Sequence, residues 1–75
     1  MSKRFSGKKV RSLRKASKLS QQKLTDKSGV SDRYLRELES GRKNNPSIEV
    51  LSNLSDALDC SVDDFLDTVE QPATV

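Results

Sequence analysis

Apolar residues recur three or four positions apart along most of this chain, and polar residues fill the positions between them. This period matches the turn of an α-helix, so each run places its apolar residues on one face. Ser20, Ser31 and Ser61 are suited to cap the first turn of a helix, and Gly41 is suited to follow the last. The pattern therefore predicts one compact all-α domain of five helices, at residues 7–16, 20–28, 31–40, 46–59 and 61–66.

The predicted core consists of the large apolar side chains that face inward on these helices. A chain of 75 residues buries only roughly 60% of the surface that its unfolded form exposes. The core is therefore thin, and association with a second copy of the chain would add to its stability. The residues expected in the core are Val10, Leu13, Leu19, Leu24, Val30, Leu35, Leu38, Ile48, Leu51, Leu54, Leu58, Val62, Phe65 and Leu66.

Residues 21–40 carry the most informative pattern in the chain. Leu24 lies on the inner side of a first short helix, which ends near Gly29, a residue that takes a positive φ without steric penalty. Leu35 and Leu38 lie three apart on a second helix. Two helices arranged in this way form a helix-turn-helix, whose second helix reads the base edges of DNA. The polar residues left on its outer face are Asp32, Arg33, Arg36 and Glu37.

Charge is distributed unevenly along the chain, whose formal net charge is +3. Residues 1–18 contain eight Lys and Arg and no acidic residue, whereas residues 46–75 contain seven Asp and Glu and no Lys or Arg. A basic run can simply solvate one face of a helix. Beside a helix-turn-helix, however, the basic end suits the phosphates of DNA, and the acidic end would be oriented away from them. We therefore expect double-stranded DNA as the main partner.

The sequence offers little for catalysis or metal binding. It contains no histidine, no phosphate-binding glycine loop and no nucleophile with a neighbouring base, so we expect neither an enzyme nor a cofactor. Cys60 is the one cysteine, and we interpret it as a small, partly buried apolar residue. No apolar run is long enough to cross a membrane, and the first ten residues are too polar for a signal peptide. A reducing, cytoplasmic location is expected.

Three segments of the chain are, in their order and spacing, similar to the Cro and phage-repressor type of helix-turn-helix domain, also called the Xre family. They are LSQQKL, SGVSDRYLRELESGR and PSIEVLSNLSDAL, and the resemblance covers about residues 7–66. It implies a five-helix, lambda-repressor-like fold whose third helix enters the major groove. It also implies a transcriptional regulator, typically a repressor, that binds an inverted-repeat operator as a homodimer.

The resemblance also implies roles for individual residues. Gln21 would stand at the start of the second helix, where its side chain and the helix end hold a phosphate. Arg14 and Glu39 would form an ion pair that stabilises the third helix and makes no base contact. The implied base-reading residues are Asp32, Arg33 and Glu37. The implied phosphate-binding residues are Gln21, Arg36, Ser40, Arg42, Lys43, Asn44 and Asn45. Tyr34 is added to this set because its own hydroxyl can bond a phosphate.

Four positions depart from the family pattern or allow two interpretations. Thr25 stands where the family favours alanine, and Ser28 stands where it favours an apolar residue. We expect the Thr25 hydroxyl to bond back to a helix carbonyl, with a small adjustment of the helix crossing. Asp32 either neutralises the N-terminus of the third helix or selects a base. Tyr34 either contacts a phosphate or packs against the core, rather than reading a base.

The expected domain limits are a basic arm at residues 1–6, the DNA-binding domain at 7–68 and a flexible tail at 69–75. The C-terminal third offers the best dimer interface, because its acidic residues would face away from DNA. It would also suit a regulatory protein partner. A competing interpretation is a small protein-interaction module, such as an antitoxin or a phage regulatory partner, whose acidic C-terminal helices bind a basic protein. The residues expected at the dimer interface are Val62, Phe65, Leu66 and Val69.

Overall fold

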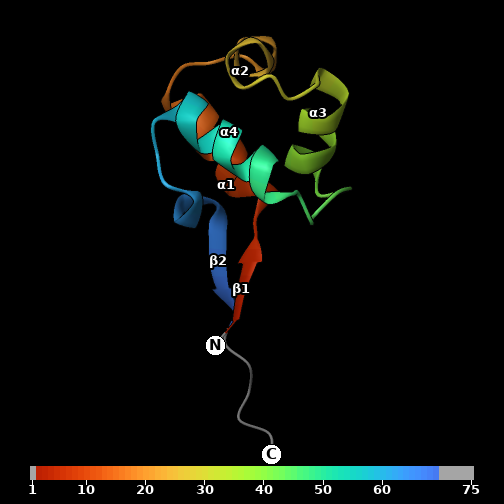
Figure 1. Cartoon of the computed structure of the whole chain (residues 1–75), viewed down its shortest axis with the longest axis vertical. Coiled ribbons are helices and arrows are strands. Elements are labelled where there is room, and N and C mark those ends of the chain that lie inside the picture. The colour runs from red at the N-terminus through yellow and green to blue at the C-terminus, as the bar shows by residue number, and fades with distance from the viewer. Residues whose placement is uncertain (1, 70–75) are drawn as a thin grey trace, which may run out of the picture.

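The computed structural model describes residues 2–69, and each of the four α-helices in this part of the chain begins after a serine. The hydroxyl of that serine accepts a hydrogen bond from the third amide of the helix, at distances between 3.1 and 3.4 Å. These bonds satisfy amides that have no partner inside the helix. None of the helices in residues 2–69 is both long and apolar enough to cross a membrane. The helices are α1 (Gly7–Ala16), α2 (Gln21–Ser28), α3 (Asp32–Ser40) and α4 (Ile48–Leu58) (Figure 1).

The helices end in two different ways. Gly29 follows α2 and Gly41 follows α3, with φ of 76° and 87°, a backbone conformation that glycine adopts without a clash. Lys18 after α1 and Asp59 after α4 take φ of 59° and 53° despite carrying side chains. The two glycines thus stand on either side of α3. They allow the chain to reverse before and after this helix.

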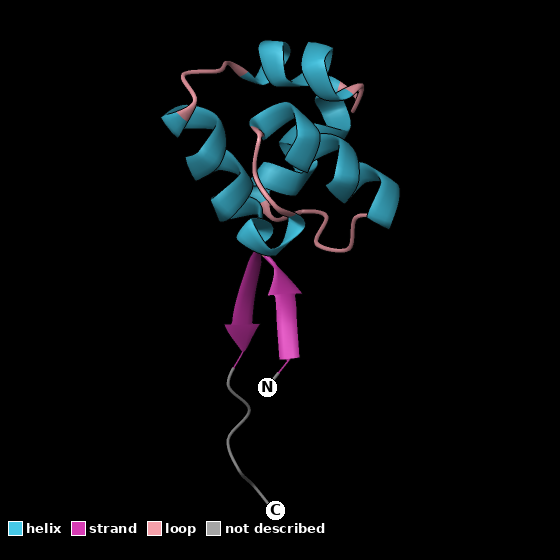
Figure 2. Cartoon of the chain, turned by 60° about the vertical axis from the view of Figure 1, so that its left-hand side comes forward, coloured by secondary structure: helices cyan, strands magenta, loops and turns pink. Residues whose placement is uncertain are grey.

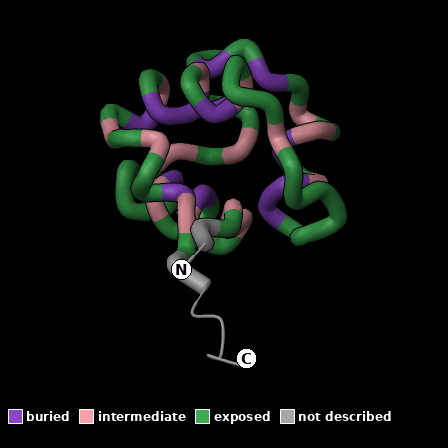
Figure 3. Tube along the Cα trace, turned by 60° about the horizontal axis from the view of Figure 1, so that its bottom comes forward, coloured by how far each residue is buried: buried purple, intermediate pink, exposed green. Residues whose placement is uncertain are grey.

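The α-helices and η1 (Val62–Phe65), one turn of 3-10 helix, enclose a single core (Figure 3). Leu13, Leu19 and Val62 lie half-buried at its edge. The prediction for Ile48 is wrong, because this residue is 78% exposed. Helical side chains tilt toward the N-terminus, so a side chain at the first position of α4 extends past the end of the helix. The buried core residues are Val10, Leu24, Val30, Leu35, Leu38, Leu51, Leu54, Leu58 and Phe65.

The ends of the described chain form a two-stranded antiparallel sheet, the terminal sheet, which the sequence pattern did not predict. β1 (Ser2–Phe5) pairs with β2 (Leu66–Val69), and the sheet extends away from the helices (Figure 2). Four-residue strands are too short to show alternation. The predicted fifth helix is wrong beyond η1, because the chain there becomes β2. The fold is mostly helical, as predicted, but residues 2–69 contain four α-helices instead of five.

Three polar contacts hold the terminal sheet and the adjoining η1 against the start of α1. Lys9 donates a hydrogen bond from Nζ to the Leu66 carbonyl oxygen at 2.7 Å and forms an ion pair with Asp67 at 2.9 Å. The Ser6 amide, at the cap of α1, donates to the Phe65 carbonyl at 2.8 Å. The hydrogen bond and positive charge of Lys9 hold the pKa of Asp67 below its ordinary value. Part of the predicted basic arm thus forms β1, and residues 70–75 of the predicted tail lie outside the described residues.

The first turn of α1 packs tightly against the last turn of α3. A Cβ atom added to Gly7 would overlap the carbonyl oxygen of Leu38. Only glycine permits this approach, since any other residue would force the two helices apart. The position of α3 in the fold is therefore set directly by the start of α1.

Candidate nucleic-acid interface

The turn between α2 and α3 is organised by Ser28. Its hydroxyl donates to the Leu24 carbonyl at 2.7 Å and accepts from the Val30 amide at 3.2 Å. The hydrogen bond expected of Thr25 is wrong: its Oγ1 atom is buried and has no partner among the described residues. The bond back to a helix carbonyl is made instead by Ser28, which is itself buried. A polar residue at this position thus ties the end of α2 to the turn.

The exposed side of α3 carries an open depression of about 370 Å³, which we call the α3 cleft. Leu35, Leu38 and Glu39 form the buried side of the same helix. The three residues with an implied base-reading role therefore lie together, and two further arginines accompany them. The residues that line the α3 cleft are Asp32, Arg33, Arg36, Glu37, Ser40 and Arg42.

An ion pair that the sequence analysis missed lies on this exposed side. Arg36 Nε is 3.1 Å from Asp32 Oδ2, one helical turn away. The two side chains are 65% and 39% exposed, so water solvates both partners. The spacing of four residues is a known signal for such pairs and could have predicted it. Asp32 thus neutralises a neighbouring side chain, in addition to its favourable position at the N-terminus of α3.

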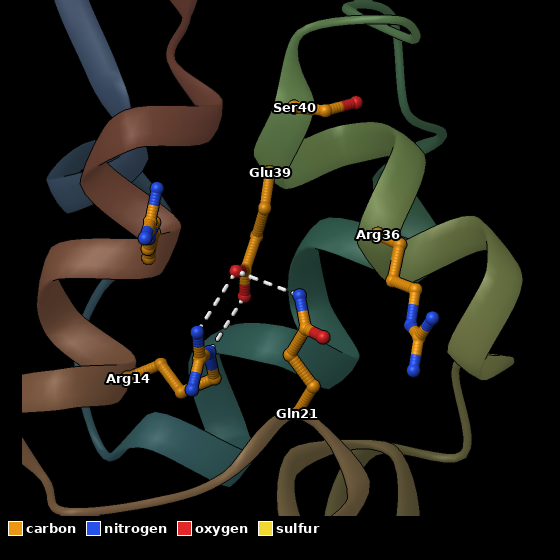
Figure 4. A pocket seen from close by; sticks show the side chains of 6 residues that line it. Arg14, Gln21, Arg36, Glu39 and Ser40 are labelled. Carbon is orange, nitrogen blue, oxygen red and sulfur yellow. Dashed lines mark hydrogen bonds and ion pairs between the residues drawn. The ribbon is translucent and has the colours of Figure 1, made fainter.

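The ion pair between Arg14 and Glu39 lies on the other side of α3. Arg14 donates to the two carboxylate oxygens of Glu39, from Nε at 2.8 Å and from Nη2 at 3.1 Å. Arg14 also donates from Nη1 to the Leu19 carbonyl at 2.8 Å. Gln21 donates to Glu39 Oε1 at 3.2 Å, so both side chains point toward this carboxylate (Figure 4). These bonds join α1, the start of α2 and the end of α3, and they satisfy groups that burial would otherwise penalise.

A second depression, of about 420 Å³, lies where these three helices meet, and we call it the α1–α3 cleft. Three arginines against one glutamate leave it with a positive charge. Gln21, Arg36 and Ser40, which have implied phosphate-binding roles, all line it (Figure 4). Arg11 joins them and was missed, although it lies one turn before Arg14 on the same helix. The full lining is Arg11, Arg14, Gln21, Arg36, Glu39 and Ser40.

The loop after α3 folds back onto that helix. The Lys43 amide donates to the Glu37 carbonyl at 3.1 Å, and Lys43 Nζ lies 5.8 Å from the centre of the Tyr34 ring. Tyr34 is half-buried and packs against the core. A cation over the face of an aromatic ring is attracted to it, so the Tyr34 ring helps to hold the Lys43 side chain in place. Arg42 lines the α3 cleft, whereas Asn44 and Asn45 are exposed and line neither cleft.

The residues expected at a dimer interface differ in their exposure. Phe65 is fully buried in the core, so its assignment to an interface is wrong. It fills the space between η1 and the helices and has no surface left for a partner. Val62 and Leu66 are half-buried and keep part of their apolar surface. Val69 is the last residue of β2, and its side chain lies outside what the structure describes.

Cys60 is half-buried against the core. Burial, together with the negative charges of Asp64 and Asp59, raises the pKa of its thiol. A protonated thiol is a poor nucleophile, so this environment disfavours a reactive cysteine. Among the residues that the structure describes, no group of three or more His, Cys, Asp and Glu side chains could hold a metal ion.

The comparison with known protein families agrees with this geometry of two helices across a tight turn. Residues 10–65, most of the chain, match the family described as helix-turn-helix. The chain belongs to this family. It is a helix-turn-helix regulator of the Cro and Xre type, and the family is one of transcription regulators rather than enzymes.

Individual helix-turn-helix proteins align over similar lengths. The transcriptional regulator SinR of Bacillus subtilis (strain 168) is 38% identical over 61 residues, which are 81% of this chain and 55% of SinR. The chain thus spans about half the length of this curated relative. The restriction-modification controller protein C.AhdI from Aeromonas hydrophila has a structure that matches with a TM-score of 0.74 and 34% identity, over 79% of this chain and 88% of C.AhdI. A structure of SinR in complex with DNA matches with a TM-score of 0.73 and 38% identity, over 75% of this chain and 89% of that one.

Proposed function

We propose that this protein binds double-stranded DNA sequence-specifically, with α3 in the major groove, and represses transcription as a dimer on an inverted-repeat operator. The observation that carries the proposal is a pair of adjoining clefts along α3: the α3 cleft holds the implied base-reading residues, and the α1–α3 cleft is positively charged. The solved complex of the relative SinR with DNA supports it.

Base reading is assigned to three residues of the α3 cleft. Arg33 is exposed at the second position of α3, and its planar guanidinium can donate two hydrogen bonds to O6 and N7 of guanine. The carboxylates of Asp32 and Glu37 can accept from the amino group of cytosine. These contacts would determine which sequence is bound.

Phosphate binding is assigned to the two edges of the α3 cleft. On one edge, the positive α1–α3 cleft and the N-terminus of α2 favour an anion. On the other edge, the exposed loop after α3 presents side chains that donate hydrogen bonds to a second phosphate. The residues assigned to phosphate are Gln21, Arg36, Ser40 and Arg11 on the first edge and Arg42, Lys43, Asn44 and Asn45 on the second, with Tyr34 supporting Lys43.

Dimerisation is assigned to the C-terminal part of the chain. Val62 and Leu66 keep apolar surface there, and Val69 follows on β2. A two-fold dimer would read two half-sites about 34 to 36 Å apart on one face of the duplex. The seven acidic residues at positions 46–75 would give a basic regulatory protein its binding surface in the same region.

Selection of bound duplexes from a random DNA pool tests this function. The purified protein should enrich sequences that contain two inverted half-sites, since each protomer reads one. Sedimentation of the complex should give two protomers on each enriched duplex. A pool without enrichment would contradict sequence-specific binding, and enrichment of single half-sites by a monomer would contradict the dimer. The competing role as a protein-interaction module predicts no enrichment at all.

A further inference from the structure

Arg36 is the side chain that connects the two clefts. It lines the α3 cleft together with Asp32, and it lines the α1–α3 cleft together with Gln21 and Ser40. Its side chain is 65% exposed and lies apart from the hydrogen bonds around Glu39 (Figure 4). A long, exposed guanidinium between two clefts can exchange a partner in one for a partner in the other. Its partner in the free protein therefore matters for binding.

That partner is Asp32. The contact between Arg36 Nε and Asp32 Oδ2, at 3.1 Å, directs the guanidinium along α3. The N-terminus of α3 stabilises the Asp32 carboxylate, since Asp32 is the first residue of the helix. The pair removes one positive charge from the surface that faces DNA. The carboxylate also opposes the approach of phosphates to this end of the helix.

We propose that Asp32 is a specificity-determining residue that restrains Arg36 until α3 meets its operator. This inference rests on the proposed function. On other DNA, phosphate contacts alone hold the protein, the pair stays closed, and Arg36 adds nothing to binding. At the operator, a base amino group binds Asp32, and Arg36 turns to a backbone phosphate at the α1–α3 cleft.

The chemistry of the base edges makes this exchange selective. A carboxylate accepts a hydrogen bond from N4 of cytosine or N6 of adenine, but guanine O6 and thymine O4 are acceptors and repel it. An exposed ion pair within one helix is weak, so a charge-assisted bond to phosphate replaces it readily. Asp32 thus releases Arg36 only where the base offers a donor.

Replacing Asp32 by asparagine tests the proposal, because the side chain keeps its size and loses its charge. Binding of the selected operator and of a random duplex is measured over a range of salt concentrations. On the random duplex, Asp32→Asn should bind about twofold more tightly or better, and the slope of log K against log salt should steepen by about 0.9, the value for one phosphate. The preference for the operator should fall about tenfold. Asp56→Asn removes the same charge from an exposed residue of α4 and should leave that preference unchanged.

The same substitution made in an Arg36→Ala protein separates two effects of Asp32→Asn, the release of Arg36 and the loss of repulsion between Asp32 and the phosphates. In the Arg36→Ala protein, Asp32→Asn should no longer steepen the salt slope on random DNA, since no guanidinium remains to be released. The same steepening in both backgrounds would overturn the proposal. An unchanged slope in the single variant Asp32→Asn would also overturn it.

A measurement without DNA keeps this inference separate from the proposed function. The Nε–H resonance of Arg36 in the free protein should move in Asp32→Asn and stay in place in Asp56→Asn. A resonance that does not move means that the pair is absent, and the inference fails. A protein with no preferred sequence would overturn the proposed function and this inference together, whereas a preferred sequence with an unchanged Asp32→Asn slope overturns the inference alone.

Discussion

Two arginine–carboxylate pairs lie on the buried and the exposed side of α3 and differ in nearly every property except their chemistry. Arg14 and Glu39 come from two helices, form two parallel hydrogen bonds and are 10% and 4% exposed. Asp32 and Arg36 belong to one helix, share one close contact and are 39% and 65% exposed. Breaking a buried pair leaves a charge without water, whereas an exposed pair exchanges its partner for water at little cost. We infer that the first pair fixes α3 and that the second is available for exchange.

The largest effect is expected at the buried pair. Glu39→Ala removes the carboxylate that accepts from both Arg14 and Gln21, and it should lower the free energy of unfolding by roughly 3 to 5 kcal/mol. Urea unfolding followed by circular dichroism measures this loss. The double variant Arg14→Met with Glu39→Leu replaces both charges by apolar side chains and should recover most of it. A loss below about 1 kcal/mol for Glu39→Ala would make the two pairs alike and contradict the comparison.

The next largest loss of stability is expected at the close contact between Gly7 of α1 and the Leu38 carbonyl of α3. Gly7→Ala places a methyl group against the Leu38 carbonyl, so it should lower the free energy of unfolding by about 1 to 3 kcal/mol. Ser12→Ala, at an exposed position of the same helix, serves as the control and should be neutral or slightly stabilising. If both variants unfold at the same urea concentration, the close approach of α1 and α3 does not exist in solution.

Residues on the exposed side of α3 should contribute to DNA binding and little to the free energy of unfolding. Arg33→Ala should weaken binding to the selected operator by roughly 1 to 3 kcal/mol and leave binding to random DNA nearly unchanged. Its free energy of unfolding should stay within about 0.5 kcal/mol of the wild type, because Arg33 is exposed. Fluorescence anisotropy and urea unfolding measure the two quantities. An equal loss on both DNAs would move Arg33 from base reading to phosphate binding.

A smaller effect on stability is expected from the exposed pair itself. Asp32→Asn removes the negative charge from the contact with Arg36 and from the N-terminus of α3, and it should cost only about 0.3 to 1 kcal/mol of folding free energy. Raising the ionic strength should shrink this difference, since salt screens exposed charges. Thermal unfolding at low and high salt measures it. If Asp32→Asn lowered the free energy of unfolding by nearly as much as Glu39→Ala does, the exposed and the buried ion pair of α3 would not differ in their contribution to stability.

The smallest effect is expected at a third ion pair, between Lys9 and Asp67. The pKa of Asp67 is lowered in the fold, so the folded state binds this proton more weakly than the unfolded chain does. Its stabilising effect is therefore present above pH 3.8, the ordinary value, and is lost as the pH falls through the lower folded pKa. Unfolding of the wild type and of Asp67→Asn over a pH series should differ at neutral pH and converge in acid. A difference that grows in acid would contradict this assignment.

The features predicted correctly from the sequence are those that a single helix or turn determines. Serine before an apolar run favours an N-cap, and Ser20 and Ser31 are both caps in the structure. Gly29 and Gly41 take the left-handed backbone that the reversals require. Leu35 and Leu38 are buried because three-residue spacing puts them on one face of α3. Each of these outcomes depends on interactions over a few residues.

The features that were missed depend on the neighbours that the fold supplies. Ile48 keeps the helical spacing, but it stands at the first position of α4 and is exposed. Thr25 and Ser28 could each have bonded back to a carbonyl, and only the packed turn decides that Ser28 does so. The pairing of β1 with β2 joins opposite ends of the described chain, so no local pattern reports it.

The pairing of β1 with β2 also has a consequence for the order of folding. Bringing the two ends of a chain together costs more loop entropy than forming a helix from neighbouring residues. A ribbon of two short strands gains little stability by itself, so it needs the helices that anchor its base to be folded already. We therefore expect the terminal sheet to form last and open first, so its amides should exchange with solvent hydrogen sooner than those of α1 to α4. Such opening would separate the chain ends while the helices stay folded.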